Sequence, residues 1–287
     1  MKRYRILQYD FDTRAHWLGL AIADDWELKV KQMHWQNRLN ILDGLMSEYG
    51  RDGLAAKVVN FLDLGPSPLS VVAFHNKFAH QARVAFVMGS YYPALTATCA
   101  LGERILNHLI RVLRDHFRST DEYKRVHGKE SIDDWRLAID ILERWDVLLP
   151  DTIGAFKELA EVRNRSLHFD PAMDTDDRPE ALNALKLLNH IVESQFPAYG
   201  PQPWFLDVPG AAFIRKEWET RPFIREIYLP NARLVGPCHK LEHVNGTWVV
   251  HDIDYDDRNV SDEEFVAMLP GEARRHEARC LSNREHR

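Results

Sequence analysis

Residues 93–113 read PALTATCALGERILNHLIRVL, and this pattern predicts a long amphipathic helix. Pro93 suits the first turn, where a backbone N–H would have no partner within the helix. The opposite face is charged and carries Glu103, Arg104 and Arg111. Apolar residues recur every three or four positions, which places them on one face: Leu95, Ala97, Leu101, Ile105, Leu109, Val112 and Leu113. We therefore expect one side of this helix to be buried in a helical core.

Helical spacing of apolar residues continues on both sides of this segment. It predicts further helices over residues 69–88, 131–142, 150–167 and 178–192. The connections between them are short, and short connections favour antiparallel neighbours. Residues 69–197 are therefore predicted to form an up-and-down antiparallel helical bundle in a mainly α protein.

The residues before this bundle are predicted to form a helical N-terminal extension, residues 1–65. Apolar residues from Trp26 to Leu45 form an amphipathic stripe, and the sequence Gly65-Pro66-Ser67-Pro68 breaks the helical pattern. Trp17 and Trp35 lie nine residues on either side of Trp26. We interpret the three tryptophans as core anchors rather than as a platform for stacked bases.

The composition changes after residue 197, where prolines and glycines predict a linker. Residues 210–287 are expected to form a small β-containing region. Strand-like runs cover residues 223–229, 233–244 and 247–255, and Asn245-Gly246 predicts a hairpin turn between the last two. Ser261 with Glu264 has the spacing of a capping box and predicts a short final helix.

The composition limits the class of protein. The 287 residues are 45% hydrophobic and 28% charged, which is typical of a globular chain, and the net charge of −6 argues against a general coat for nucleic acids. Three widely spaced cysteines indicate reduced thiols and a cytoplasmic protein. No run of 18 apolar residues predicts a membrane span, and the charged first residues do not resemble a secretory signal.

One polar cluster in the predicted helix of residues 150–167 is suited to chemistry. Asn164 and His168 are four residues apart and share a face, while Arg163 lies about 140° from His168 around the helix. Arginine binds phosphate oxygens as a rigid fork, and histidine exchanges a proton near neutral pH. If the nucleophile is the 2′-hydroxyl of RNA, this set requires no metal and no other cofactor.

The motif Arg163-Asn164-x-x-x-His168 within a helical bundle resembles the HEPN superfamily (higher eukaryotes and prokaryotes nucleotide-binding). The upstream residues 91–106, which contain Leu101-Gly102-Glu103-Arg104, look like the helix that packs beside the motif in such proteins. The resemblance covers residues 69–197 and neither flank. It implies a metal-independent endoribonuclease that forms a 2′,3′-cyclic phosphate, as in toxin–antitoxin, phage-defence or RNA-processing systems.

The resemblance also implies roles for individual residues. Arg163 would stabilise the scissile phosphate, His168 would be the general acid or base, Asn164 would orient one of them, and Glu103 would help to position the motif. Members of the superfamily act as homodimers whose two motif helices form one cleft. Three further arginines are candidates for RNA binding: Arg165, Arg104 and Arg111.

Other interpretations of the same residues stay open at this point. The bundle could be an inactive dimerisation or interaction module, with an antitoxin or a nucleotidyltransferase as its partner. Arg163 and His168 could also lie on an ordinary solvated helix face. A metal-dependent hydrolase would use the C-terminal cluster of Cys238, His239, His243 and His251, but Cys-His-x-x-x-His is not an established zinc spacing.

Overall fold

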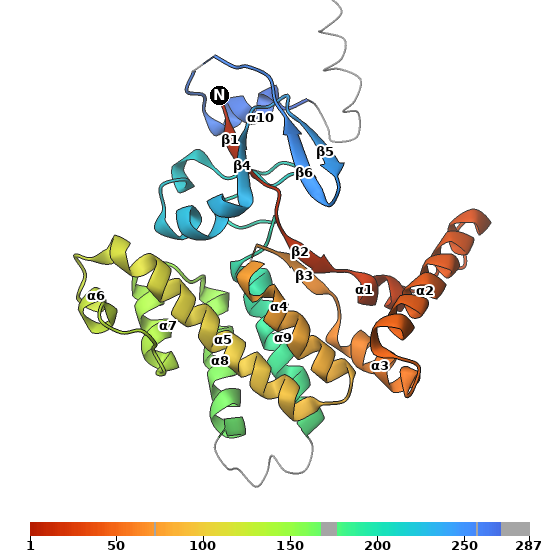
Figure 1. The fold of residues 1–287 in the computed structure, drawn as a ribbon. Coiled ribbons are helices and arrows are strands. Elements are labelled where there is room, and N and C mark those ends of the chain that lie inside the picture. Colours follow the sequence, from red (N-terminus) through yellow and green to blue (C-terminus); the bar gives the residue numbers. More distant parts are fainter. Residues whose placement is uncertain (72, 168–176, 257, 271–287) are drawn as a thin grey trace, which may run out of the picture. The chain divides into compact units, whose positions relative to one another are not determined.

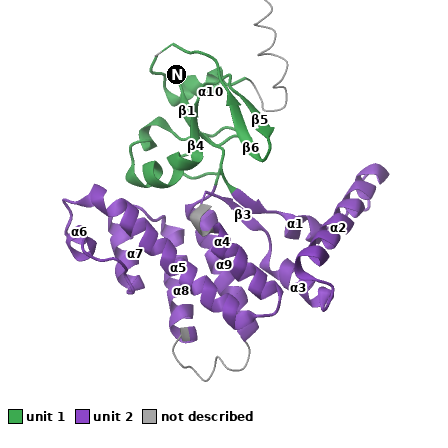
Figure 2. Cartoon of the chain, viewed as in Figure 1, with its two compact units in different colours: residues 1–9, 198–287 green, residues 10–197 purple. Residues whose placement is uncertain are grey.

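The computed structural model describes residues 1–71, 73–167, 177–256 and 258–270, and it confirms a mainly α fold with small two-stranded sheets (Figure 1). The chain divides into two compact units (Figure 2). We call residues 10–197 the helical unit, and residues 1–9 together with 198–287 the terminal unit. The predicted break at Gly65-Pro66 lies inside the helical unit. The first nine residues join the C-terminal region rather than an N-terminal extension.

The helical unit is built around α5 (Tyr91–Leu113), the helix predicted from residues 93–113. One face of α5 is buried from Ala94 to Leu113, and the helix packs against four others. These are α4 (Ala73–Val87), α7 (Trp135–Arg144), α8 (Pro150–Leu167) and α9 (Asp177–Gln195). A short helix, α6 (Asp121–Val126), lies in the connection between α5 and α7. Thr120 and Asp134 cap α6 and α7 by accepting hydrogen bonds from backbone N–H groups.

The predicted helix over residues 69–88 begins later than expected. Ser67–Ser70 form strand β3, which pairs with β2 (Asp10–Asp12), and α4 starts at Ala73. The pairing with β2 explains the delay, because residues held in an extended strand cannot take the helical conformation. This short β ladder ties the beginning of the helical unit to the start of α4.

The N-terminal part of the helical unit holds α1 (Arg14–Gly19), α2 (Leu28–Tyr49) and α3 (Leu54–Leu64). The interpretation of its tryptophans as core anchors is wrong for two of them, since Trp17 is 40% and Trp35 56% exposed. The buried residues of α2 are Ile41, Leu45 and Tyr49, all in its second half. The first half of α2 thus leaves apolar side chains on the surface.

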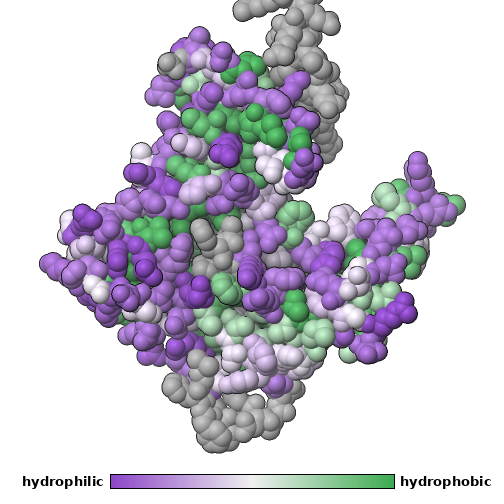
Figure 3. Space-filling view, in the orientation of Figure 1, coloured by the Kyte–Doolittle hydropathy of each residue, from purple (hydrophilic) through white to green (hydrophobic). Residues whose placement is uncertain are grey.

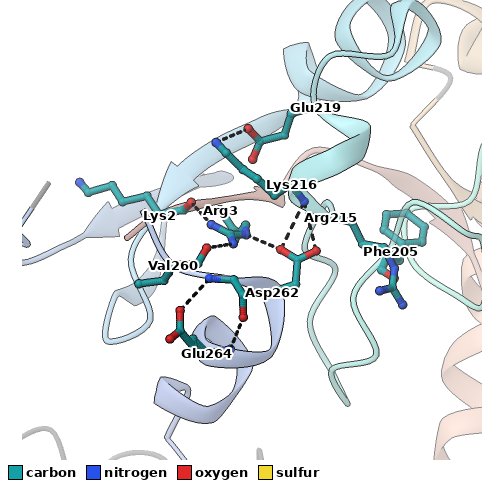
Figure 4. Close-up of polar contacts among 10 residues, drawn as sticks. Lys2, Arg3, Phe205, Arg215, Lys216, Glu219, Val260, Asp262 and Glu264 are labelled. Atoms are coloured by element: carbon teal, nitrogen blue, oxygen red, sulfur yellow. Dashed lines mark hydrogen bonds and ion pairs between the residues drawn. The ribbon is translucent and has the colours of Figure 1, made fainter. Parts of the chain in front are cut away.

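The terminal unit combines the first and last parts of the chain. Strand β1 (Arg3–Ile6) pairs antiparallel with β4 (Ala232–Val235). Arg3 is 1% exposed, and its guanidinium donates to Asp262 Oδ1 at 2.7 Å and to the carbonyl of Val260 at 2.6 Å (Figure 4). One cluster of its buried residues comprises Leu206, Phe213, Val235, Val260 and Phe265.

The predictions for the C-terminal region are met in part. β5 (Lys240–Val244) and β6 (Thr247–His251) form the predicted hairpin, with positive φ at Asn245 and Gly246. Ser261 and Glu264 form the predicted capping box of α10 (Asp262–Met268). The strand predicted over residues 223–229 is wrong.

Residues 224–228 of that segment form a π-helical turn instead. The buried residues of the segment are Phe223, Ile224, Ile227 and Tyr228, which recur at helical rather than alternating spacing. The rings of Phe223 and Tyr228 pack against Trp204. Short helical turns also cover residues 216–218 and 229–231.

No helix in the described ranges is both long enough and apolar enough to cross a membrane.

Candidate functional site

The carboxylate of Glu103 joins three helices of the bundle. Its Oε2 atom accepts a hydrogen bond from the indole Nε1 of Trp135 on α7, at 3.0 Å. The same atom pairs with Nη2 of Arg163 on α8, also at 3.0 Å. The guanidinium carbon of Arg163 lies 5.6 Å from the Trp135 ring centroid, within range of a cation–π contact. Two predicted site residues, Glu103 and Arg163, are therefore in direct contact.

The residue before Glu103 makes this close approach possible. A Cβ atom on Gly102 would lie 2.6 Å from Cη2 of Trp135 and 3.0 Å from Cδ2 of Leu159. Real side chains do not come this close, so α7 and α8 can pack against α5 here because residue 102 has no side chain. Gly102 thus brings the indole and the guanidinium to the carboxylate.

The Glu103–Arg163 pair lies partly at the surface. The Arg163 side chain is 23% exposed and that of Glu103 is 28% exposed. An arginine side chain has five N–H donors in a fixed fork, and the ion pair with Glu103 uses one of its terminal nitrogens. The remaining donors can serve a ligand while Glu103 and Trp135 hold the guanidinium in place.

A basic groove adjoins Glu103 along the exposed face of α5. It encloses about 690 Å³, and its charged lining comprises the three arginines Arg104, Arg111 and Arg114 and the two glutamates Glu103 and Glu130, with His108 between them. Residues 104, 108 and 111 are separated by four and three positions, so they follow one face of the helix. The predicted RNA-binding residues Arg104 and Arg111 are therefore brought together with Glu103.

The groove residues differ in how firmly they are held. Arg104 lies over the ring of Phe78 at 4.6 Å, which fixes its guanidinium at the edge of α4. The pKa of His108 is lowered by burial and by the charge of Arg111, which favours the neutral imidazole. Arg111 is exposed and has no acidic partner among the described residues, so its charge is available to a ligand.

The opposite wall of the groove is held by two side chains that the sequence did not single out for this purpose. Asn107 donates to the carbonyl of Ile132 at 3.1 Å and accepts from its N–H at 2.7 Å. Arg114 donates to the carbonyls of Val126 and Lys129. These contacts fasten the connection between α6 and α7 to α5.

The other predicted residues are not gathered in this groove. Arg165 pairs with Glu180 of α9 at 3.3 Å. Asn164 is partly exposed, and its side chain has no hydrogen-bond partner among the described residues. His168 directly follows the last residue of α8 in the sequence but lies outside the described residues. Of the predicted site residues, Arg163 and Glu103 are therefore the pair whose contact the structure describes.

A cysteine lies close to this site as well. Burial raises the pKa of the Cys99 thiol to about 11, although a hydrogen bond with Ser166 and the charge of Arg163 act in the opposite direction. The thiol therefore stays protonated at neutral pH and is a poor nucleophile. Trp135 and Cys99 were not predicted as site residues, because contacts between distant helices leave no local pattern in the sequence.

The alternative metal site in the terminal unit does not assemble. His239 contacts Arg5 and the carbonyl of Gly236, His243 packs on Trp248, and His251 pairs with Glu242. Across the described part of the chain, no group of three potential metal ligands lies close together.

Comparison of the chain with family models, with curated proteins and with solved structures found no match in any of the three. The geometry of the site is therefore the basis for assigning a function.

Proposed function

We propose that this chain is a metal-independent endoribonuclease of the HEPN type that cleaves RNA by attack of its 2′-hydroxyl. The observation that carries the proposal is the 3.0 Å pairing of Glu103 with Arg163 beside a groove lined by Arg104 and Arg111. An anchored guanidinium next to exposed positive charge suits the binding of a polyanion, even in a chain whose net charge is −6.

In the proposed reaction, the 2′-oxygen of the substrate attacks the adjacent phosphorus and the bond from phosphorus to the 5′-oxygen breaks. The products are a 2′,3′-cyclic phosphate and a 5′-hydroxyl end. Free N–H donors of Arg163 stabilise the negative charge that develops on the phosphoryl oxygens. Glu103 has a positioning role, because it orients the guanidinium and reduces its motion.

Proton transfer is assigned to His168 from the sequence motif. An imidazole with an ordinary pKa of about 6.5 can remove the proton of the 2′-hydroxyl and can also protonate the leaving 5′-oxygen. Asn164 is proposed to orient His168 or a phosphate oxygen. A homodimer, which the HEPN resemblance implies, would bring two such motifs into one cleft. We propose that this dimer acts in the cytoplasm, in a defence or toxin–antitoxin system.

Purified protein should cleave RNA in the presence of EDTA and leave 2′,3′-cyclic phosphate ends. His168→Ala should abolish cleavage while the circular dichroism spectrum is unchanged. Arg163→Lys should reduce cleavage strongly, because lysine keeps the charge and loses the planar fork. Arg165→Lys is the matched control, since Arg165 pairs with Glu180 and does not line the groove. Cleavage that persists in His168→Ala would remove the mechanism.

A second candidate function, an inactive interaction module, is favoured by one feature of the same site. Glu103 accepts hydrogen bonds from both Trp135 and Arg163, and this link between three helices can stabilise the bundle without any role in catalysis. In that case no RNA is cleaved in EDTA, and the bundle serves as a docking partner for an antitoxin or a nucleotidyltransferase. The cleavage assay separates the two functions.

A further inference from the structure

The first half of α2 exposes more apolar surface than a helix face in water normally carries. Leu28 is 71%, Trp35 56% and Leu39 55% exposed, while the buried residues of α2 begin at Ile41. Figure 3 shows separate hydrophobic patches among hydrophilic residues on the helix that Figure 1 labels α2. This half of α2 is packed on one side, where His34 contacts the rings of Trp17 and Trp26, and its apolar residues at 28, 35 and 39 remain uncovered.

The exposed face of α2 follows a heptad pattern. Its residues alternate at spacings of four and three, as the a and d positions of a coiled coil do. In d-a-d-a-d-a order they are Leu28, Gln32, Trp35, Leu39, Leu42 and Met46. Residues 28, 32, 35 and 39 are exposed, and residues 42 and 46 are partly exposed. The one polar core position is Gln32, and polar groups at a positions help to select a register.

The two flanks of this stripe differ in accessibility. On the g flank, Lys31 donates to the carbonyl of Asp24 at 2.5 Å, and Arg38 donates to the carbonyl of Leu20 and lies over Trp35. On the e flank, Lys29, Gln36 and Asp43 are all exposed. A partner helix can therefore use the charges of the e flank, whereas those of the g flank are engaged by residues 20–24.

We propose that α2 binds α2 of a second copy of this chain as an antiparallel coiled coil. A parallel pair brings g residues against e residues of the partner, and the g side chains are already engaged. An antiparallel pair sets e residues against e residues on one edge and g residues against g residues on the other, so the accessible e charges can pair with one another. In the proposed register, Trp35 lies opposite the partner's Leu39, and the two-fold axis passes at the level of Asn37. The symmetry then forms two ion pairs, each between Lys29 of one copy and Asp43 of the other. Antiparallel helix dipoles favour this direction as well.

The proposed contact is independent of the ribonuclease site. It uses the face of α2, whereas Glu103 and Arg163 lie on α5 and α8. A dimer formed by the motif helices would therefore persist when the α2 contact is broken, and cleavage activity and association through α2 can fail separately.

The test is the molar mass of the full-length chain by sedimentation velocity at micromolar concentrations. Leu39→Asp should halve the mass of the wild-type assembly, because it places a charge in two core layers at once. Val59→Asp is the matched control: Val59 is 53% exposed on α3, outside the heptad stripe, and its replacement should leave the mass unchanged.

Charge reversal tests the direction of pairing. Lys29→Glu should raise the dissociation constant by about tenfold, because each of two ion pairs becomes a like-charge contact. The double variant Lys29→Glu with Asp43→Lys should restore the wild-type value. A monomeric wild type, or an assembly unchanged by Leu39→Asp, would overturn the α2 contact. Failure of the double variant to restore association would overturn the antiparallel register.

Discussion

The indole of Trp135 occupies the space in which a side chain on Gly102 would lie. The gap between Cη2 of Trp135 and an ideal Cβ on Gly102 is 2.6 Å, too short for any real contact. The indole of Trp135 therefore reaches Glu103 because Gly102, the residue before Glu103, has no side chain.

Gly102→Ala is expected to lower the free energy of unfolding by about 1–3 kcal/mol, because α5 must move away from Trp135 or the indole must leave its rotamer. Urea denaturation measures the loss. Gly44→Ala is the matched control: Gly44 lies in α2 with open space around it, and the change should stabilise the helix by about 0.5–1 kcal/mol. Equal effects of the two substitutions would contradict the packing argument.

Glu103→Gln is expected to cost about 0.5–1 kcal/mol of stability, because the amide oxygen still accepts from Trp135 while the ion pair with Arg163 is lost. RNA cleavage should fall, since Arg163 is less firmly oriented. Glu180→Gln removes the comparable ion pair with Arg165 and should leave cleavage unchanged. An equal loss of cleavage in both variants would show that the effect does not arise at Glu103.

Arg111→Gln should weaken RNA binding by removing one phosphate contact from the groove. For single-stranded RNA, the slope of log affinity against log salt concentration should become shallower by about 0.7. Fluorescence anisotropy over a series of salt concentrations measures this slope. Arg136→Gln is the control, because Arg136 is 80% exposed on α7 and pairs with Glu161 outside this groove. An unchanged slope for Arg111→Gln would exclude the groove as the RNA path.

The terminal unit should lose stability in mild acid. Burial, reinforced by the charge of Arg5, lowers the pKa of His239, although the contact with the Gly236 carbonyl and the charge of Asp252 oppose the shift. The folded state thus binds the imidazole proton more weakly than the unfolded state does. The resulting stability is fully present above the ordinary value of about 6.5 and is lost as the pH falls from there through the lower folded pKa.

Thermal unfolding between about pH 7.5 and pH 5 measures this dependence. His239→Gln should flatten it, whereas His243→Gln, at an exposed position of β5, should not. If the pH dependence of His239→Gln is the same as that of the wild type, the assignment to His239 is incorrect.

Local patterns predicted the elements whose signals lie within a few residues. The stripe of α5, the Asn245-Gly246 turn and the Ser261 capping box are of this kind, and the structure contains all three. Periodicity also holds the explanation for residues 223–229. Their buried positions have helical spacing, and this periodicity outweighs the β propensity of the individual apolar residues.

Contacts between distant segments were not predictable in this way. Trp135 and Glu103 are 32 residues apart in the sequence, and no local sequence pattern around either residue indicates their contact. The exposure of Trp35 has the same origin, because a helical stripe indicates that a face is apolar but does not identify what covers it. The site residues Glu103 and Arg163 were found through their resemblance to a motif, and their contact is a property of the fold.

The pairing of Arg3 with Asp262 has a consequence for biosynthesis. The two residues are 259 positions apart, and a ribosome adds about 5–20 residues per second. Arg3 is therefore synthesised roughly 10–50 s before its partner Asp262. The helical unit can be completed during this interval, while β1 waits without its partner strand. A nascent chain stalled before β4 would therefore hold a finished bundle with a loose, chaperone-accessible first strand.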